Sequence, residues 1–336
     1  MKELSIDDIF YQIDKFSNSN NTIIITDSNV YNLYLKDKKY KIIVFKPGED
    51  NKNLNTIEYI YSKLEEYNTD RHSILIGFGG GIVTDVVGYV ASTYMRGLKF
   101  YFVSTTLLGM IDASIGGKNG VNYKNYKNLI GTFNTAEDIY YSLEFLNTLP
   151  GEEIHAGVGE ILKYAIGFDK ELFDLLNNTN YEDLISNDFI LSKVINKCIS
   201  IKEDIVKEDF EENNLRKKLN LGHTIAHAIE KSTHSFVHGE AVGIGLFVMT
   251  YYSAYLNKID YNTLIDIISL IEKYHFTLPI PEYKNVLTCI KYINNDKKSN
   301  NQDIDLILIK GIGSCEIESK NKNEFIEKIK SIFLVS

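Results

Sequence analysis

The histidines are the residues whose types and spacing point most clearly to chemistry. Four of the 7 histidines fall within sixteen positions, namely His223, His227, His234 and His238. His223 and His227 are spaced i, i+4 on an expected helix, so both rings project from one face. Glu160 lies among small and apolar residues, where an exposed acid is out of place. Two imidazoles and one carboxylate form an open zinc site with room for water or substrate. Spacing alone selects His223 and His227 as the pair of metal-ligating histidines. The alternative is that these histidines bind no metal and lie on a helix surface or bond to the backbone in the core.

A glycine-rich turn is the second candidate site. Residues 74–81 read as a strand that runs into three consecutive glycines, and Asp85 lies in the helix expected next. Glycines let a backbone approach a phosphate closely, and a helix N-terminus supplies N–H groups and a favourable dipole. The turn therefore favours a dinucleotide site over a tight turn without a ligand. Two acids that end the first two expected strands could bind ribose hydroxyls, although each alone is more typical of a strand-end cap: Asp27 and Glu49.

Lysines in a second glycine-rich segment suggest an anionic substrate. Residues 112–122 place Lys118 directly after two glycines, and Lys127 and Asn128 follow shortly afterwards. Lysines in such a loop suit a phosphate or a carboxylate. A solvated surface lysine is the ordinary alternative for any single one, but adjacent glycines are seldom needed in a surface loop.

Alternating strands and helices must position the first two sites. β-branched runs cover residues 21–27, 40–49, 72–81 and 98–106, with helical spacing at 54–67 and 83–91. This alternation predicts a parallel sheet with helices on its faces and ligands beyond the carboxyl ends of the strands. Past Pro150 helical periodicity dominates. We therefore expect an α/β nucleotide-binding domain over residues 1–148 and an all-α metal- and substrate-binding domain over residues 149–336.

Composition excludes several classes of protein. The chain has 336 residues, a net charge of −9 and 3 cysteines without a CxxC motif. The acidic balance argues against a nucleic-acid-binding surface, and the cysteine usage is typical of a reduced, cytoplasmic protein. The most apolar stretch, residues 241–256, is interrupted by glycines and is interpreted as a buried helix. The N-terminal residues lack the long apolar run of a signal peptide. We expect a cytoplasmic protein that binds neither nucleic acid nor membrane.

Taken together, these motifs resemble the 3-dehydroquinate synthase family of the shikimate pathway. The matching segments occur in the family's order and cover residues 79–88, 93–97, 105–108, 112–122, 127–131, 160–164, 216–230, 238–242 and 296–313. Any one of them is weak, but the set is highly specific. The resemblance implies the two-domain architecture expected above, with the active site in the cleft, and the cofactors NAD and Zn²⁺ or Co²⁺.

The resemblance also implies a role for each motif residue. It makes Glu160, His223 and His238 the metal ligands, in place of the pair that spacing selects, and it turns His227 toward the substrate for proton handling. The residues implied to contact NAD are Asp27, Asn29, Glu49, Lys52, Gly80, Gly81, Asp85, Thr105, Thr106 and Lys127. The residues implied to be catalytic are Asp112, Lys118, Lys163 and His227. The residues implied to bind substrate are Arg96, Asn128, Lys202, Arg216, Asn220, Lys297 and Lys298. Arg96 would reach the substrate phosphate of a neighbouring subunit, which implies a homodimer.

The reaction implied is the conversion of 3-deoxy-D-arabino-heptulosonate 7-phosphate to 3-dehydroquinate and phosphate. It proceeds by transient oxidation, phosphate elimination, re-reduction and aldol cyclisation, as a lyase of aromatic amino acid biosynthesis. One alternative is a metal-dependent NAD polyol dehydrogenase of the same fold, which would release NADH and need no phosphate clamp. Others are a sugar-phosphate cyclase whose substrate lacks a carboxylate, and a non-catalytic NAD-binding protein. The retained lysine and arginine set argues against each of them.

Overall fold

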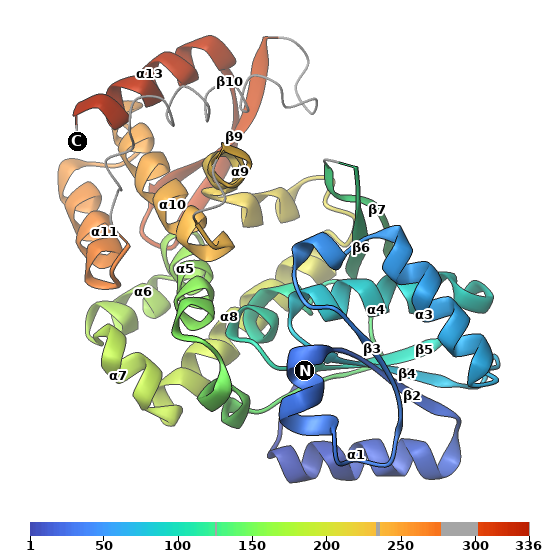
Figure 1. Ribbon diagram of the computed structural model, residues 1–336. Coiled ribbons are helices and arrows are strands. Elements are labelled where there is room, and N and C mark those ends of the chain that lie inside the picture. The colour runs from blue at the N-terminus through green and yellow to red at the C-terminus, as the bar shows by residue number, and fades with distance from the viewer. Residues whose placement is uncertain (125, 233–235, 277–301, 336) are drawn as a thin grey trace. The chain divides into compact units, whose positions relative to one another are not determined.

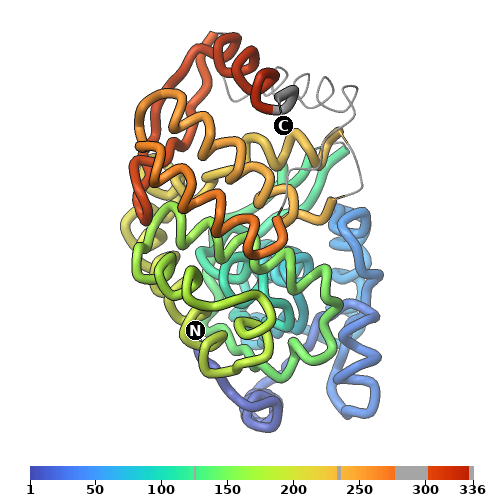
Figure 2. The backbone as a smooth tube through the Cα atoms, turned by 90° about the vertical axis from the view of Figure 1, so that its left-hand side faces the viewer, coloured from blue at the N-terminus to red at the C-terminus, as the bar shows by residue number. Residues whose placement is uncertain are grey.

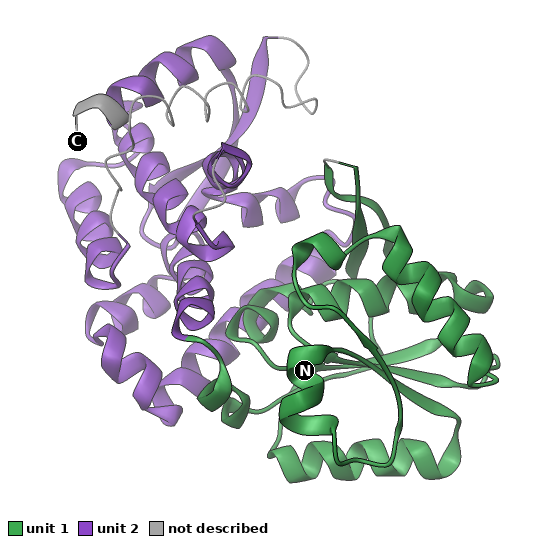
Figure 3. Cartoon of the chain, viewed as in Figure 1, with its two compact units in different colours: residues 1–150 green, residues 151–336 purple. Residues whose placement is uncertain are grey.

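The chain folds into two compact units. The computed structural model describes residues 1–124, 126–232, 236–276 and 302–335. Unit 1 is Met1–Pro150 and unit 2 is Gly151–Ser336 (Figure 3). The sequence analysis places the boundary after residue 148.

Unit 1 is built on a six-stranded sheet (Figure 1). All of its strand pairs are parallel, as the alternation of strand and helix signals predicts. The order across the sheet is β1 (Lys2–Glu3), β8 (Ile139–Tyr141), β5 (Lys99–Ser104), β4 (Ile74–Gly79), β2 (Thr22–Asp27) and β3 (Lys41–Phe45). The glycine turn follows β4 directly, so its place beyond the carboxyl end of a strand agrees with the expectation.

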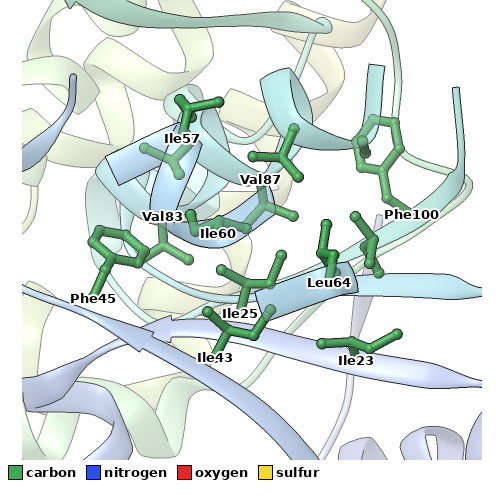
Figure 4. Close-up of a cluster of buried hydrophobic side chains, with 14 of the residues drawn as sticks. Ile23, Ile25, Ile43, Phe45, Ile57, Ile60, Leu64, Val83, Val87 and Phe100 are labelled. Carbon is green, nitrogen blue, oxygen red and sulfur yellow. The ribbon is translucent and has the colours of Figure 1, made fainter. Parts of the chain in front are cut away.

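Helices provide the apolar surfaces that cover this sheet. The helices of unit 1 are α1 (Ile6–Ser19), α2 (Ser28–Val30), α3 (Leu54–Glu66) and α4 (Gly81–Thr93), with short helical turns at Tyr31–Leu35, Glu49–Asn51, Tyr94–Arg96, Gly109–Ala113 and Leu143–Thr148. In the core that Figure 4 shows, Ile23 and Ile25 of β2 pack beside Ile57 of α3 and Val83 and Val87 of α4. Ile23 and Ile25 share a face because successive strand side chains alternate between faces.

An antiparallel hairpin completes unit 1. Its strands are β6 (Lys118–Tyr123) and β7 (Tyr126–Phe133). β6 packs against α4 so closely that a Cβ added at Gly88 would meet Asn119 Oδ1 at 1.8 Å. The hairpin therefore holds a fixed place beside the helix that begins at the glycine turn.

Unit 2 is helical, as expected, with one addition. Its helices are α5 (Gly151–Gly167), α6 (Lys170–Asn177), α7 (Tyr181–Ser186), α8 (Asp188–Glu208), α9 (His223–Ser232), α10 (His238–Tyr255), α11 (Tyr261–Lys273) and α13 (Lys322–Val335), with a 3-10 turn at Leu215–Asn220. Helix α10 packs against α5, α9 and α11, and the C-terminal helix α13, red in Figures 1 and 2, packs against α10. None of the helices in the described segments is both long enough and apolar enough to cross a membrane.

The expectation of an all-α second domain is corrected by a hairpin. Strands β9 (Asp303–Gly311) and β10 (Ser314–Asn321) pair antiparallel around a turn in which Gly313 has a φ of +76°. In β9, Ile304 and Leu306 are buried and alternate with exposed Asp303 and Asp305, the period of two that a half-buried strand produces. Because this alternation covers only residues 303–306, helical periodicity does not reveal it.

Candidate active site

Three side chains from three helices converge in unit 2. Glu160 lies within α5, while His223 and His238 are the first residues of α9 and α10. The Nε2 atoms of His223 and His238 lie 3.4 and 3.3 Å from Glu160 Oε1. One ligand atom from each residue lies within 4.8 Å of the other two. This arrangement can hold a metal ion on two imidazoles and one carboxylate.

The structure does not bring His227 into this group. His227 is exposed one turn along α9, and its ring centroid lies 5.5 Å from that of His223. The i, i+4 pair that spacing selects does not form a ligand pair, because His238 at the start of α10 lies beside Glu160 and His223 instead. His234 lies outside the described residues.

Close backbone contacts bring the three helices together at this point. A Cβ added at Gly159 would lie 2.2 Å from the carbonyl oxygen of Gly239, so α5 and α10 touch backbone to backbone beside Glu160 and His238. A Cβ at Gly245 would lie 2.1 Å from the carbonyl oxygen of Gly222, the residue before His223. Gly222 itself has a φ of +80°, a conformation that favours glycine. These glycines set the spacing of the ligand atoms.

Both histidines are oriented by a hydrogen bond at Nδ1. His223 Nδ1 lies 3.1 Å from the Leu221 carbonyl oxygen, and His238 Nδ1 lies 3.3 Å from Glu230 Oε1. Because both partners are acceptors, each Nδ1 donates a proton, which leaves the Nε2 lone pair of a neutral ring available to a metal. Glu230 falls within a segment that matches the family, but its spacing predicts no role for it.

The surrounding charges favour an ionised carboxylate. Lys163 Nζ lies 2.5 Å from Glu160 Oε2, and both side chains are 1% exposed. Burial alone would raise the pKa of Glu160, but Lys163 and the two imidazoles hold it well below its usual value. Burial opposes a charge on His238, yet the carboxylates of Glu160 and Glu230 raise the pKa of His238 to about 9. The centre is therefore electrostatically prepared for a cation, which would displace the histidine proton.

Further basic residues of unit 2 are buried. Lys202 of α8 is 6% exposed and Arg216 of the 3-10 turn is 2% exposed, although residues of these types are mostly exposed in proteins. The Arg216 backbone N–H donates to Asp209 Oδ2 at 3.0 Å, and Asn220 Nδ2 donates to Glu212 Oε1 at 2.7 Å. These contacts fix the turn that carries two of the expected anion-binding side chains. Lys297 and Lys298 lie outside the described residues.

The expected nucleotide residues gather at the carboxyl ends of β2, β4 and β5. Gly80 precedes α4, and a Cβ there would meet Thr106 Cγ2 at 2.7 Å. The Thr105 backbone N–H donates to the Gly79 carbonyl at 3.1 Å, so the glycine turn and the threonine pair lie side by side. Asp27 accepts hydrogen bonds from the N–H groups of Asn29 and Val30 and so caps α2. Gly81 begins α4, and Lys52 forms a partly buried ion pair with Asp85.

The other predicted residues of unit 1 lie on the hairpin and at three turns. Lys118, Lys127 and Asn128 are exposed on β6 and β7, and Asp112 lies in the turn Gly109–Ala113. Glu49 Oε1 accepts a hydrogen bond from Asn122 Nδ2 at 2.8 Å. Arg96 is exposed after α4 with a φ of +68°, next to Met95 at +49°.

Comparisons with known proteins agree on one family. A family model for the N-terminal part of 3-dehydroquinate synthase matches residues 42–156, and one for its C-terminal part matches residues 157–299. The 3-dehydroquinate synthase of Clostridium tetani is 38% identical over 330 residues, which is 94% of this chain and 87% of that protein. The Campylobacter hominis 3-dehydroquinate synthase is 40% identical over 320 residues, which is 91% of each protein.

Solved structures show the same fold at lower identity. A 2-deoxy-scyllo-inosose synthase complexed with carbaglucose-6-phosphate, NAD⁺ and Co²⁺ has a TM-score of 0.85 at 22% identity, over 96% of this chain and 94% of that one. The 2-epi-5-epi-valiolone synthase of Streptomyces hygroscopicus, with NAD⁺ and Zn²⁺ bound, has a TM-score of 0.82 at 24% identity, over 95% and 92%. A glycerol dehydrogenase of Schizosaccharomyces pombe has a TM-score of 0.63 at 14% identity, over 97% and 86%.

Proposed function

This chain belongs to the 3-dehydroquinate synthase family, and we propose that it converts 3-deoxy-D-arabino-heptulosonate 7-phosphate to 3-dehydroquinate and phosphate. The observation that carries the proposal is the convergence of Glu160, His223 and His238 beside a buried lysine, in a chain 38% identical to a named synthase over 94% of its length. The enzyme would be a lyase of the shikimate pathway, which leads to the aromatic amino acids.

The metal fits the donor set of this chain. Glu160, His223 and His238 would hold zinc or cobalt, and their fit rests on the two Nδ1 hydrogen bonds that leave both Nε2 atoms available. When bound, the metal supplies Lewis-acid stabilisation to a substrate oxygen. Lys163 would keep Glu160 ionised and in place through their buried ion pair.

NAD fits the glycine turn of unit 1. A Cβ at Gly80 would meet the Thr106 side chain at 2.7 Å, so the turn favours glycine, whose bare backbone can approach a phosphate closely. When bound, NAD supplies a reversible hydride acceptor, so that no NADH is released overall. The residues that would hold it are Asp27, Asn29, Glu49, Lys52, Gly80, Gly81, Asp85, Thr105, Thr106 and Lys127.

Basic side chains would fix the two charged ends of the substrate. Lys202 and Arg216 would bind the carboxylate, since the Arg fork suits two oxygens at once. The phosphate would be bound by Lys118, Asn128, Asn220 and either Lys297 or Lys298. Holding both ends of a long anion orients its middle for reaction.

Protons would move at two places. His227 would accept the proton of the substrate hydroxyl, while Asp112 and Lys163 orient the reacting part of the substrate. A carbonyl acidifies the neighbouring C–H, and an oxygen of the clamped phosphate would take that proton before phosphate leaves. The open-chain product then closes by an intramolecular aldol addition.

We further propose a cytoplasmic homodimer. Arg96 is exposed on a backbone whose two consecutive non-glycine residues have positive φ. Such a conformation costs energy and persists where the surroundings or a function require it. Arg96 would bind the substrate phosphate of the partner subunit.

Product identification tests the proposed activity directly. The purified protein, supplied with NAD and zinc, is incubated with the heptulosonate phosphate, and the mixture is followed by proton NMR. We expect 3-dehydroquinate to accumulate in step with substrate loss. Unchanged substrate, together with oxidation of glycerol or another polyol, would assign the chain to the dehydrogenases that share the fold.

A further inference from the structure

Asn122 of β6 is bonded to two other segments of unit 1 at once. Its side-chain Nδ2 donates to Glu49 Oε1 at 2.8 Å and to the Glu49 carbonyl oxygen at 3.3 Å. Its side-chain Oδ1 accepts from the Asn128 backbone N–H at 2.8 Å. Its own backbone N–H donates to the Lys52 carbonyl oxygen at 2.8 Å. One residue therefore connects the segment after β3 with both strands of the hairpin.

The amide of Asn122 has only one orientation that satisfies these partners. Both protons of Nδ2 point at Glu49 oxygens, and Oδ1 faces an N–H group. In the reversed orientation, oxygen would face oxygens and the NH₂ group would face a donor. Asparagine is the residue that supplies a double donor and an acceptor on so short a side chain.

The partners of Asn122 belong to two different proposed subsites. Glu49 and Lys52 are proposed to contact NAD, and Asn128 is proposed to bind the substrate phosphate. We infer that Asn122 is a positioning residue that holds the cofactor-binding segment 49–52 and the phosphate-binding residue Asn128 in one fixed arrangement. The inference rests on the proposed function, which assigns those two subsites.

The bond to Asn128 falls where the hairpin ladder is irregular. The pairing of β6 with β7 shifts register between Val121 and Tyr123, and Asn128 has a φ of +52°. The Asn128 backbone N–H therefore bonds to the Asn122 side chain where the regular strand pairing is interrupted. This hydrogen bond holds the backbone at Asn128, whose side chain is exposed. On the other side, the Asn122 amide holds one carboxylate oxygen of Glu49 and so limits how that side chain turns.

Two substitutions separate the two links. Asn122→Asp keeps the acceptor for the Asn128 N–H but removes both donated bonds and sets a negative charge against Glu49. Asn122→Ala removes both side-chain links and keeps the backbone hydrogen bond to Lys52. We expect Asn122→Asp to raise the dissociation constant of NAD about tenfold, because a hydrogen bond to a charged group is lost. The dissociation constant of inorganic phosphate should stay within twofold. Asn122→Ala should weaken NAD and inorganic phosphate binding about tenfold each.

A matched control tests for simple damage to the hairpin. Asn119 lies on the same strand, and its Nδ2 donates to the carbonyl groups of Gly117 and Asn134. Asn119→Ala should lower the Tm with both dissociation constants within twofold of the unsubstituted chain. All constants are measured by calorimetry on zinc-loaded protein without sugar phosphate, and the Tm of every variant is recorded.

Each outcome bears on the inference. The inference is supported if Asn122→Asp weakens NAD binding alone and Asn122→Ala weakens the binding of both NAD and phosphate. It is overturned if both dissociation constants are unchanged in the two folded variants. It is also overturned if Asn119→Ala weakens binding equally. If the unsubstituted chain binds no NAD, both the proposed cofactor and this inference fail. If it binds NAD and phosphate but makes no 3-dehydroquinate, the proposed function fails, while the split in binding still decides the role of Asn122.

Discussion

At the scale of single residues, the candidate metal centre depends as much on supporting contacts as on its ligands. Glu160 is paired with Lys163, while the imidazoles of His223 and His238 are oriented by Leu221 and Glu230. Such partners fix the tautomer and direction of a ligand. The resemblance to the family predicted the three residues that converge, whereas helical spacing alone paired His223 with His227, which lies outside this group.

Glu230 gives a test at this scale. Glu230→Ala removes the acceptor at His238 Nδ1, and we expect the dissociation constant of zinc to rise 10- to 100-fold, the usual range for outer partners of a ligand. The measurement is a competition titration of metal-free protein with a chelating dye. Glu240→Gln is the matched control, because Glu240 lies in the first turn of the same helix and bonds to the Val237 N–H at 3.3 Å. If zinc binding is weakened equally in both variants, the negative charge near the site matters and the hydrogen bond from His238 to Glu230 does not.

At the scale of elements, glycines determine how closely the ligand-bearing helices approach. Gly159 touches the carbonyl of Gly239 on α10, whereas Gly151, at the start of the same helix, has nothing within 4 Å of an added Cβ. A methyl group at Gly159 must push the two helices apart, since the atom it meets is backbone.

The two glycines form a matched pair of substitutions. We expect Gly159→Ala to lower the free energy of unfolding by about 1–3 kcal/mol through overpacking and to weaken zinc binding, because Glu160 and His238 move apart. Gly151→Ala should leave zinc binding unchanged and stability within about 0.5 kcal/mol. Urea denaturation and the zinc titration measure both effects. Normal zinc affinity in Gly159→Ala would show that the helix contact does not set the ligand spacing.

Much of the element order was predictable from the sequence, for physical reasons. The β-branched runs that end in polar or turn residues predicted the parallel sheet, and the glycine turn after residues 74–79 predicted the start of α4. The β9–β10 hairpin was not predicted because the alternation in β9 covers only residues 303–306 and gives way to a continuous buried run up to Ile309. The roles of Glu230 and Asn122 were also out of reach, since both depend on contacts between segments that the sequence does not place together.

At the scale of the whole molecule, the chain is two compact units that divide the chemistry. Unit 1 carries the glycine turn and the Lys118–Asn128 hairpin region, and unit 2 carries the metal centre. The proposed reaction needs both sets, and the proposed role of Arg96 adds a residue from a second copy of the chain.

Subunit complementation tests the role of Arg96. Arg96→Ala should remove phosphate binding in the partner's site, and His238→Ala should abolish metal binding in its own site. Each variant alone should be inactive. When the two are mixed and allowed to exchange subunits, we expect activity to return, because one site of the mixed dimer has a complete set. No recovery, with mixed dimers demonstrated by mass spectrometry, would place Arg96 outside the partner's site.

The most direct test of the central claim measures phosphate and NADH together. The protein is given the heptulosonate phosphate and NAD, then treated with a chelator, and finally resupplied with zinc. We expect stoichiometric phosphate release with no net rise in NADH absorbance, loss of release on chelation, and recovery with zinc. Phosphate release that persists without metal, or NADH that accumulates in step with substrate loss, would contradict a metal-dependent, redox-neutral synthase.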